Sequence, residues 1–337
     1  EESWWTRARE AVNRVRTELK PVFSLLREHY SVDCIAWYQR LWHDDGLWAE
    51  VACGLERPQG AEGSLRTLDD GVIAFEDAVP LLYLKGELEG YPVKRGIMHV
   101  VVDEIQDYAP LQLQVLTKTF PAARFTLVGD AQQSLHPFVW SSGAGSLADL
   151  FEGLELATVR LNKSYRSTQE IFRFCSALAG SSSAATVLRT GAKPVVYQVE
   201  REQYGARLAA LVKEGLDAGH GLVAVIAKTV EECQEIFSVL RLQDVGVQPS
   251  LLIRESAEFE RGVLVLPVFL AKGLEFDAVV IANVSTAQYS AKYDRRLLYV
   301  ACSRALHKLD LICSGDLSPF VKSLPAELYE LEAGLGS

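Results

Sequence analysis

Two adjacent carboxylates, Asp103 and Glu104, follow a short nonpolar run that extends from Ile97 to Val102. The β-branched residues of that run predict a buried strand. A carboxylate at the end of such a strand can hold Mg²⁺ against nucleotide phosphates, often through water, and a second carboxylate beside it can polarise an attacking water. Asp103 suits the first task and Glu104 the second. An isolated Asp-Glu pair more often lies in a turn or caps a helix. The pair alone therefore does not establish a metal-binding and catalytic role.

A second polar segment supports that role. Phe125 to Val128 is another nonpolar run, and Gln133 follows it closely. Between the two runs, Pro110 opens a predicted helix that extends to about Lys118, because proline is tolerated in a first helical turn. Strands that end in polar groups, with a helix between them, predict a parallel sheet with its site at the C-terminal ends of the strands. There Gln133 can hydrogen-bond a γ-phosphate or its attacking water, although a capped turn would explain Gln133 alone.

The remaining chain divides into a helical start and a second α/β region. Nonpolar residues from Trp5 to Leu19 recur at helical spacing, and residues 1 to about 90 are predicted to be helical. Five of the six tryptophans lie there, either as core residues or as a partner-facing surface. After about Arg160, strands are predicted at Pro194–Val199, Leu222–Ala227, Val263–Leu266, Ala278–Ala282 and Leu309–Cys313, and helices at Tyr204–Ala218 and Val230–Leu240.

The composition is that of a folded globular protein rather than of a protein that coats nucleic acid non-specifically. The 337 residues suggest two or three domains, and 49% hydrophobic residues are enough for sizeable cores. The net charge of −10 argues against broad, non-specific DNA binding and leaves room for a basic or nucleic-acid-binding partner. The six cysteines form no CxxC pair, which predicts free thiols and a cytoplasmic location.

Five segments, in order, resemble the motifs of superfamily 1 helicases of the UvrD/Rep kind. They are Val100–Tyr108 (motif II), Leu127–Ser134 (motif III), Leu161–Thr168 (motif IV), Phe269–Asp277 (motif V) and Arg295–Leu311 (motif VI). The resemblance implies an α/β protein with two RecA-like parallel-sheet units that hydrolyses ATP or GTP with Mg²⁺.

The resemblance also implies a role for each candidate residue. Phosphoryl transfer needs charge stabilisation at the γ-phosphate, and arginine suits this because its fork is planar, charged and bidentate. The implied catalytic residues are Glu104, Gln133, Arg166 and Arg304, with Arg304 as the arginine finger, and Asp103 would bind the metal. Lys272 and Gly273 would lie near phosphate, and Glu275 would accept a hydrogen bond from the ribose. Phe138 and Trp140 would contact nucleic acid. Val139 and Trp140 replace the family's usual residues after Phe138, and a core role for Phe138 is equally consistent.

The phosphate-binding loop that such a motor requires is absent from this sequence. GxxxxGK[ST] needs a glycine followed by lysine, and no glycine here is followed by lysine. We therefore expect the chain to be the C-terminal part of a longer protein, with the loop in the missing N-terminal part. The predicted division is a helical segment at 1–70, the end of a first, incomplete RecA-like unit at 71–158, and a second unit at 159–337.

The amino-acid sequences of two segments, Leu81–Leu116 and Pro267–Ile281, are most similar to those of the HelD-type helicases. That resemblance implies bacterial RNA polymerase as partner and an NTP-driven motor that releases polymerase from nucleic acid. Two alternatives stay open at this point. The protein can be a DNA-repair helicase or translocase of the UvrD/Rep kind, or a non-catalytic interaction module on a degenerate ATPase fold.

Overall fold

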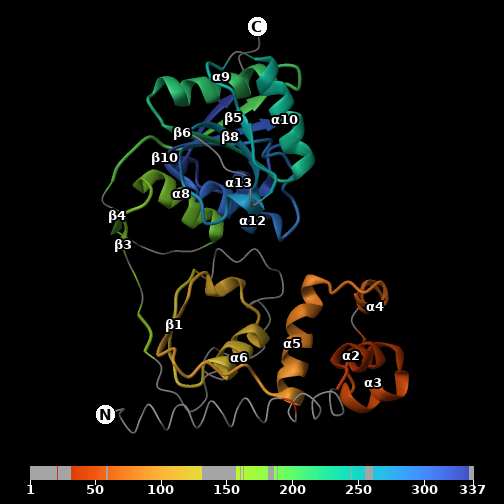
Figure 1. The fold of residues 1–337 in the computed structure, drawn as a ribbon. Helices are drawn as coiled ribbons and strands as arrows, with labels where there is room; N and C mark the ends of the chain where they lie inside the picture. The colour runs from red at the N-terminus through yellow and green to blue at the C-terminus, as the bar shows by residue number, and fades with distance from the viewer. Residues whose placement is uncertain are drawn as a thin grey trace, which may run out of the picture. The chain divides into compact units, whose positions relative to one another are not determined.

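The structure is a computed structural model that describes residues 21, 32–57, 60–130, 157–159, 161, 163–180, 186–187, 189–243, 245–254 and 261–333. The chain separates into two units, Glu1–Val128 with Gly143–Glu152, and Gly129–Ser142 with Gly153–Ser337 (Figure 1). The three-part division made from the sequence stays a prediction. Within the described ranges, no helix is long and nonpolar enough to cross a membrane.

The first unit begins with four described helices, which confirm the helical prediction for this part of the chain. They are α2 (Cys34–His43), α3 (Asp45–Val51), α4 (Ala61–Asp69) and α5 (Phe75–Glu89). Their small core contains Tyr38, whose hydroxyl donates to the buried Asp77 carboxylate at 2.9 Å. Trp42 packs at the edge of this core and stacks on Trp48, while Trp37 is 49% exposed. The described tryptophans are therefore divided between core and surface.

Two parallel strands follow, β1 (His99–Val102) and β2 (Arg124–Leu127), with Val100 opposite Phe125. The helix between them, α6 (Pro110–Thr119), begins at the proline that the sequence marked as its first residue. A short 3₁₀ turn, η1 (Ile105–Asp107), lies directly beyond β1. The strand–helix–strand pattern predicted around Asp103 is thus confirmed, with the strand boundaries moved by one or two residues.

The second unit is built on a seven-stranded sheet in the order β11-β5-β10-β9-β6-β8-β7, and every described pairing in it is parallel. Its strands are β5 (Val195–Val199), β6 (Leu222–Ala227), β7 (Ser250–Leu251), β8 (Gly262–Pro267), β9 (Phe276–Ile281), β10 (Ala305–Ser314) and β11 (Glu330–Ala333). The five strands predicted from nonpolar runs all lie in this sheet. The two short edge strands, β7 and β11, were not predicted, because neither has a nonpolar run. The α/β fold class is confirmed.

Helices cover both faces of this sheet, which explains why its central strands are nonpolar throughout. In β6, Ala224 and Ile226 face the core shared with α8 (Gln169–Ala179) and α12 (Asp294–Cys302). Val223 and Val225 face the opposite core, shared with α9 (Tyr204–Asp217) and α10 (Val230–Leu242). Figure 1 shows α9 and α10 on one side of the strands and α8 and α12 on the other.

Shorter elements complete the second unit. They are β3 (Lys163–Ser164), β4 (Thr186–Val187), α11 (Val268–Ala271), α13 (Pro319–Lys322) and the 3₁₀ turn η3 (Ala326–Leu328). β3 and β4 pair with each other in a separate two-stranded sheet. The four-residue α11 follows β8 directly and overlaps the start of the segment that resembles motif V.

The start of α10 provides a test of this local structure. Thr229 is the N-cap, and its hydroxyl oxygen accepts from the Glu232 amide at 3.2 Å while Glu232 Oε2 accepts from the Thr229 amide at 3.4 Å. Thr229→Ala is expected to lower the free energy of unfolding by about 1 kcal/mol, because it leaves an amide of the first turn without its acceptor. Urea unfolding followed by circular dichroism measures this. Ser238→Ala, an exposed hydroxyl within the same helix, is the control and should change it by less than about 0.5 kcal/mol. Equal effects of the two variants would contradict the capping role.

Candidate functional site

The carboxylate pair lies where β1 ends, in a turn with an unusual backbone. Glu104 has a φ of +50°, in the left-handed region. For a residue with a side chain this conformation costs roughly 1–2 kcal/mol, and such outliers cluster at functional sites. The Asp103 carboxylate accepts a hydrogen bond from the Glu104 amide at 2.8 Å, which holds the turn in place. The sequence pattern located these two acids but gave no sign of the strained turn.

Gln106 is a residue of this turn that the sequence reasoning missed. It is only 2% exposed, and its side-chain amide donates to the Glu104 carboxylate. A buried amide that holds a carboxylate in one direction restricts where Glu104 can place its other oxygen. The spacing in the run Asp103-Glu104-Ile105-Gln106-Asp107 could have indicated this contact, because in a tight turn the side chain two residues after the glutamate can lie on the same side.

The donor set of this turn fits Mg²⁺ in the form in which nucleotide enzymes use it. Magnesium prefers oxygen ligands, keeps several waters, and is bound through one or two carboxylates together with phosphates. Asp103 is exposed at the end of β1, with Glu104 beside it. Among the described residues no group of three or more His, Cys, Asp or Glu side chains could hold a metal ion.

In the second unit, the structure brings together Arg166 and Arg304, which are far apart in sequence. One guanidinium N–H of Arg166 points to the Leu274 carbonyl at 3.4 Å, and one of Arg304 points to the same carbonyl at 3.5 Å. Arg166 also forms an ion pair with Glu275 at 2.7 Å. Two cations and one carboxylate therefore meet at the turn between α11 and β9, and three of the residues predicted from separate segments lie in one place.

Arg304 is enclosed by the protein, with only 1% of its surface exposed. Its Nε donates to the Val300 carbonyl at 3.0 Å, and one terminal nitrogen donates to the Ser303 hydroxyl at 2.9 Å. These bonds fold the side chain back along α12. The arginine-finger role stays a prediction, and it requires the guanidinium to exchange at least one of these neutral acceptors for a phosphate oxygen.

The turn from Lys272 to Glu275 has the shape that its glycine permits. Gly273 has a φ of +78°, and a β-carbon at this position would meet no atom within 4 Å. Backbone conformation, rather than crowding, is therefore what favours glycine here. Lys272 is partly buried and Glu275 is exposed, with Arg166 as its ion-pair partner. The phosphate role of Lys272 and Gly273 and the ribose role of Glu275 stay predictions.

A family profile described as UvrD-like helicase C-terminal domain matches residues 262–312, from the start of β8 into β10. This part of the chain is a UvrD-like helicase C-terminal domain. The matched residues include Lys272, Gly273, Glu275 and Arg304. The seven-stranded parallel sheet is consistent with the RecA-like unit predicted after Arg160.

The chain is also similar to a solved structure. It is the C-terminal domain of a possible DNA helicase from Lactobacillus plantarum WCFS1, with 35% sequence identity and a TM-score of 0.43; the similarity covers 50% of this chain and 98% of that chain. No curated protein matches the chain.

Three predicted site residues, Gln133, Phe138 and Trp140, lie outside the described residues. Their roles at a γ-phosphate or a nucleic-acid base stay predictions. Asp103, Glu104 and Arg166 are described but lie outside the segment that the helicase profile matches, so their roles also rest on the sequence and the local geometry.

The nonpolar core beside Arg304 buries two thiols, Cys175 and Cys302. Burial raises the pKa of Cys175 to about 12 and raises the pKa of Cys302 well above its usual range. Since the thiolate is the reactive form, neither should react with a thiol reagent at pH 8 before unfolding. Cys53 is exposed and should react quickly. Labelling with a chromogenic disulfide reagent, compared with Cys53→Ser, measures this. Rapid labelling of Cys175 or Cys302 in the folded protein would contradict the packing around Arg304.

Proposed function

We propose that this chain is the C-terminal part of a superfamily 1 motor that hydrolyses ATP or GTP with Mg²⁺. The observation that carries the proposal is that Arg166 and Arg304 both contact the Leu274 carbonyl, with Glu275 paired to Arg166. Two guanidinium groups at one turn are what a phosphoryl-transfer site needs to stabilise charge on the transferred group. The helicase C-terminal domain containing Arg304 supports the same class of activity.

Each described residue has a definable task in this proposal. Asp103 would hold Mg²⁺, which neutralises charge between the phosphates when bound. Glu104, oriented by Gln106, accepts a proton from the attacking water. Arg166 and Arg304 exchange carbonyl and hydroxyl acceptors for anionic oxygens, and such charge-assisted hydrogen bonds are roughly twice as strong as neutral ones. Arg304 donates to a carbonyl and a hydroxyl, whereas Arg166 is paired with Glu275, so an arriving phosphate would compete with that carboxylate for Arg166.

The exposure of β1 supports the proposal that further chain completes the first unit. Val101 is 65% exposed although it lies inside a parallel strand. Parallel sheets are normally covered on both faces. We propose that the N-terminal part of the same protein, carrying the phosphate-binding loop, covers this side of β1.

Glu104→Gln in the full-length protein tests hydrolysis. The turnover number should fall by about 100-fold or more, because a general base contributes roughly 10²–10⁴-fold, while nucleotide binding should persist. Phosphate release measures the first quantity and fluorescent-nucleotide titration the second. Glu62→Gln, an exposed carboxylate on α4, is the control and should behave as wild type. Equal, substantial turnover in both proteins would contradict the role of Glu104, whereas no turnover in the wild type would favour a non-catalytic interaction module.

For the task of the motor, we propose the release of bacterial RNA polymerase from nucleic acid. The support is the similarity of residues 81–116 and 267–281 to HelD-type sequences and the negative net charge of the chain. The alternative, a UvrD/Rep-type DNA-repair helicase, is equally compatible with the description of the family that matches residues 262–312. Both tasks use the same hydrolysis site, so substrate release has to distinguish them.

Stalled transcription complexes on immobilised DNA provide this distinction. The full-length protein is expected to co-purify with core polymerase and, with ATP or GTP, to release polymerase from the beads. Glu104→Gln should bind but not release, because only hydrolysis is removed. Duplex unwinding from a 3′ overhang, without polymerase binding, would contradict the polymerase task and support the repair helicase.

A further inference from the structure

Helices α8 and α12 lie antiparallel, and their contacts at both ends show this. Arg166 lies just before the start of α8 and Arg304 just after the end of α12, and both point to the Leu274 carbonyl. At the opposite ends, Arg295 in the first turn of α12 reaches the last turn of α8. Its Nε donates to the Leu178 carbonyl at 2.6 Å, and a terminal nitrogen lies 3.4 Å from the Ala177 carbonyl. One end of the helix pair therefore holds the two candidate catalytic arginines, and the other end is fastened by Arg295.

The contact uses carbonyls of the last turn of α8, and one of them, that of Ala177, also accepts from the Gly180 amide. The last carbonyls of a helix have no partner within it, and a cation there also interacts favourably with the helix dipole. Gly180 ends α8 with a φ of +74°, and a β-carbon at this position would lie 3.2 Å from an Arg295 terminal nitrogen. Glycine therefore ends the helix and leaves space for the guanidinium.

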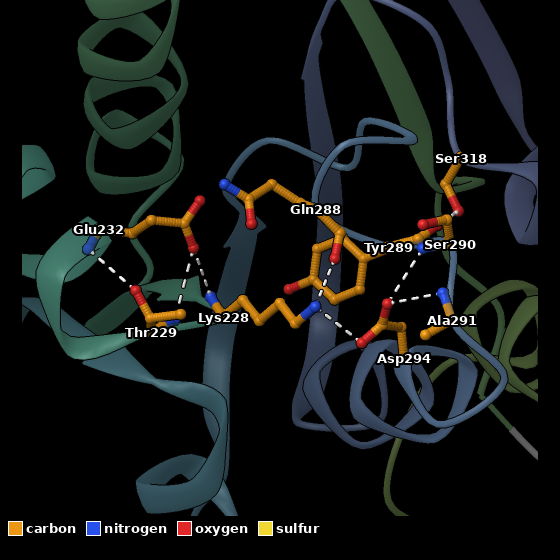
Figure 2. A network of polar contacts seen from close by, with 9 residues as sticks. All are labelled: Lys228, Thr229, Glu232, Gln288, Tyr289, Ser290, Ala291, Asp294 and Ser318. Carbon is orange, nitrogen blue, oxygen red and sulfur yellow. Dashed lines mark hydrogen bonds and ion pairs between the residues drawn. The ribbon is translucent and has the colours of Figure 1, made fainter.

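The neighbouring residue, Asp294, fastens the same turn of α12 to the sheet. One carboxylate oxygen accepts from the Ser290 and Ala291 amides at 3.0 and 2.8 Å, and the other lies 2.7 Å from the Lys228 ammonium (Figure 2). Lys228 directly follows β6 and also donates to the Gln288 carbonyl at 2.6 Å.

Electrostatics keep Asp294 charged in this position. It is only 5% exposed, and burial opposes ionisation. The hydrogen bonds from Lys228, Ala291 and Ser290 outweigh that effect and keep the pKa of the carboxyl below its usual value. On the far side of the loop, the Ser318 hydroxyl donates to the Tyr289 carbonyl at 2.7 Å, as Figure 2 shows. The first turn of α12 is thus held from two directions, by α8 and by the end of β6.

We propose that Arg295 is a positioning residue for nucleotide hydrolysis, which fixes α12 against α8 at one end and so places Arg304 relative to Arg166 at the other. This rests on the proposed hydrolytic function. The physical reason is that a short helix moves as a rigid body, so a shift at its first turn also moves its last turn. A shift of α12 by one residue moves its end by about 1.5 Å and turns it by about 100°, and a misplacement of about 1 Å can cost on the order of 100-fold in rate.

The experiment compares Arg295→Met with Arg296→Met in the full-length protein. Arg296 is the next residue of α12, and the helix directs it about 100° away from Arg295. Arg295→Met should lower the turnover number by about 10-fold to 100-fold and leave the KM for nucleotide nearly unchanged, because only transition-state contacts are displaced. Arg296→Met should match wild type. Arg295→Lys, which keeps a cation at the α8 carbonyls, should recover part of the loss.

A second measurement separates positioning from a loss of folding. Titration with a fluorescent nucleotide gives the fraction of sites that bind, and rates are expressed per binding site. In an Arg304→Lys background, Arg295→Met should have little additional effect, because the group it positions has already been changed. Independent, multiplicative effects of the two changes would overturn the proposal, as would a rate per site that does not fall in Arg295→Met. If Arg295→Met does not fold, Arg295→Gln replaces it with the same expectations.

The outcomes also distinguish this inference from the proposed function. Wild-type protein that hydrolyses nucleotide in a Glu104-dependent way, with Arg295→Met equal to Arg296→Met, would overturn the positioning role alone. A full-length wild-type protein without hydrolysis would overturn both.

Discussion

The parallel pairing of β6 with β8 and β9 is the constraint on which the second unit depends. Parallel strands must be covered on both faces, and β6 meets that demand by alternating its side chains between two nonpolar cores. Every strand of the sheet then ends at the same edge, so the segments that follow β6 and β8 emerge side by side there. Lys228 and α11 lie at that edge for this reason. The polar residues of the site are carried by turns whose positions the sheet has already fixed.

The two units hold the polar groups of their candidate site residues differently. In the first unit, strain in the Glu104 backbone and one buried amide, Gln106, orient the carboxylate within a few residues of chain. In the second, Arg166, Leu274 and Arg304 come from three separate elements, and only tertiary packing brings them together. A local change would therefore affect the first arrangement, whereas the second responds to any shift of α8 or α12.

This difference also explains what the sequence could predict. Strands such as Leu222–Ala227 were predicted to the residue, because a strand buried on both faces is nonpolar throughout. The start of α6 was predicted from Pro110, because proline favours that position. The contacts of Arg166 with Leu274 and of Arg295 with α8 could not be predicted, since both are made to backbone carbonyls, and carbonyls have no identity in a sequence. Two-residue strands such as β7 lack a pattern long enough to recognise.

The strand order has a consequence for how the chain is made. β5 is the first strand of the large sheet to be synthesised, yet its described neighbours are β10 and β11, the last two. On a ribosome, β5 must wait for about 100 further residues before its neighbours are made, which takes roughly 5–20 s at ordinary elongation rates. During that interval the edge of β5 is unpaired and can pair with the wrong strand. The sheet is therefore completed late, when β10 and β11 pair with β5.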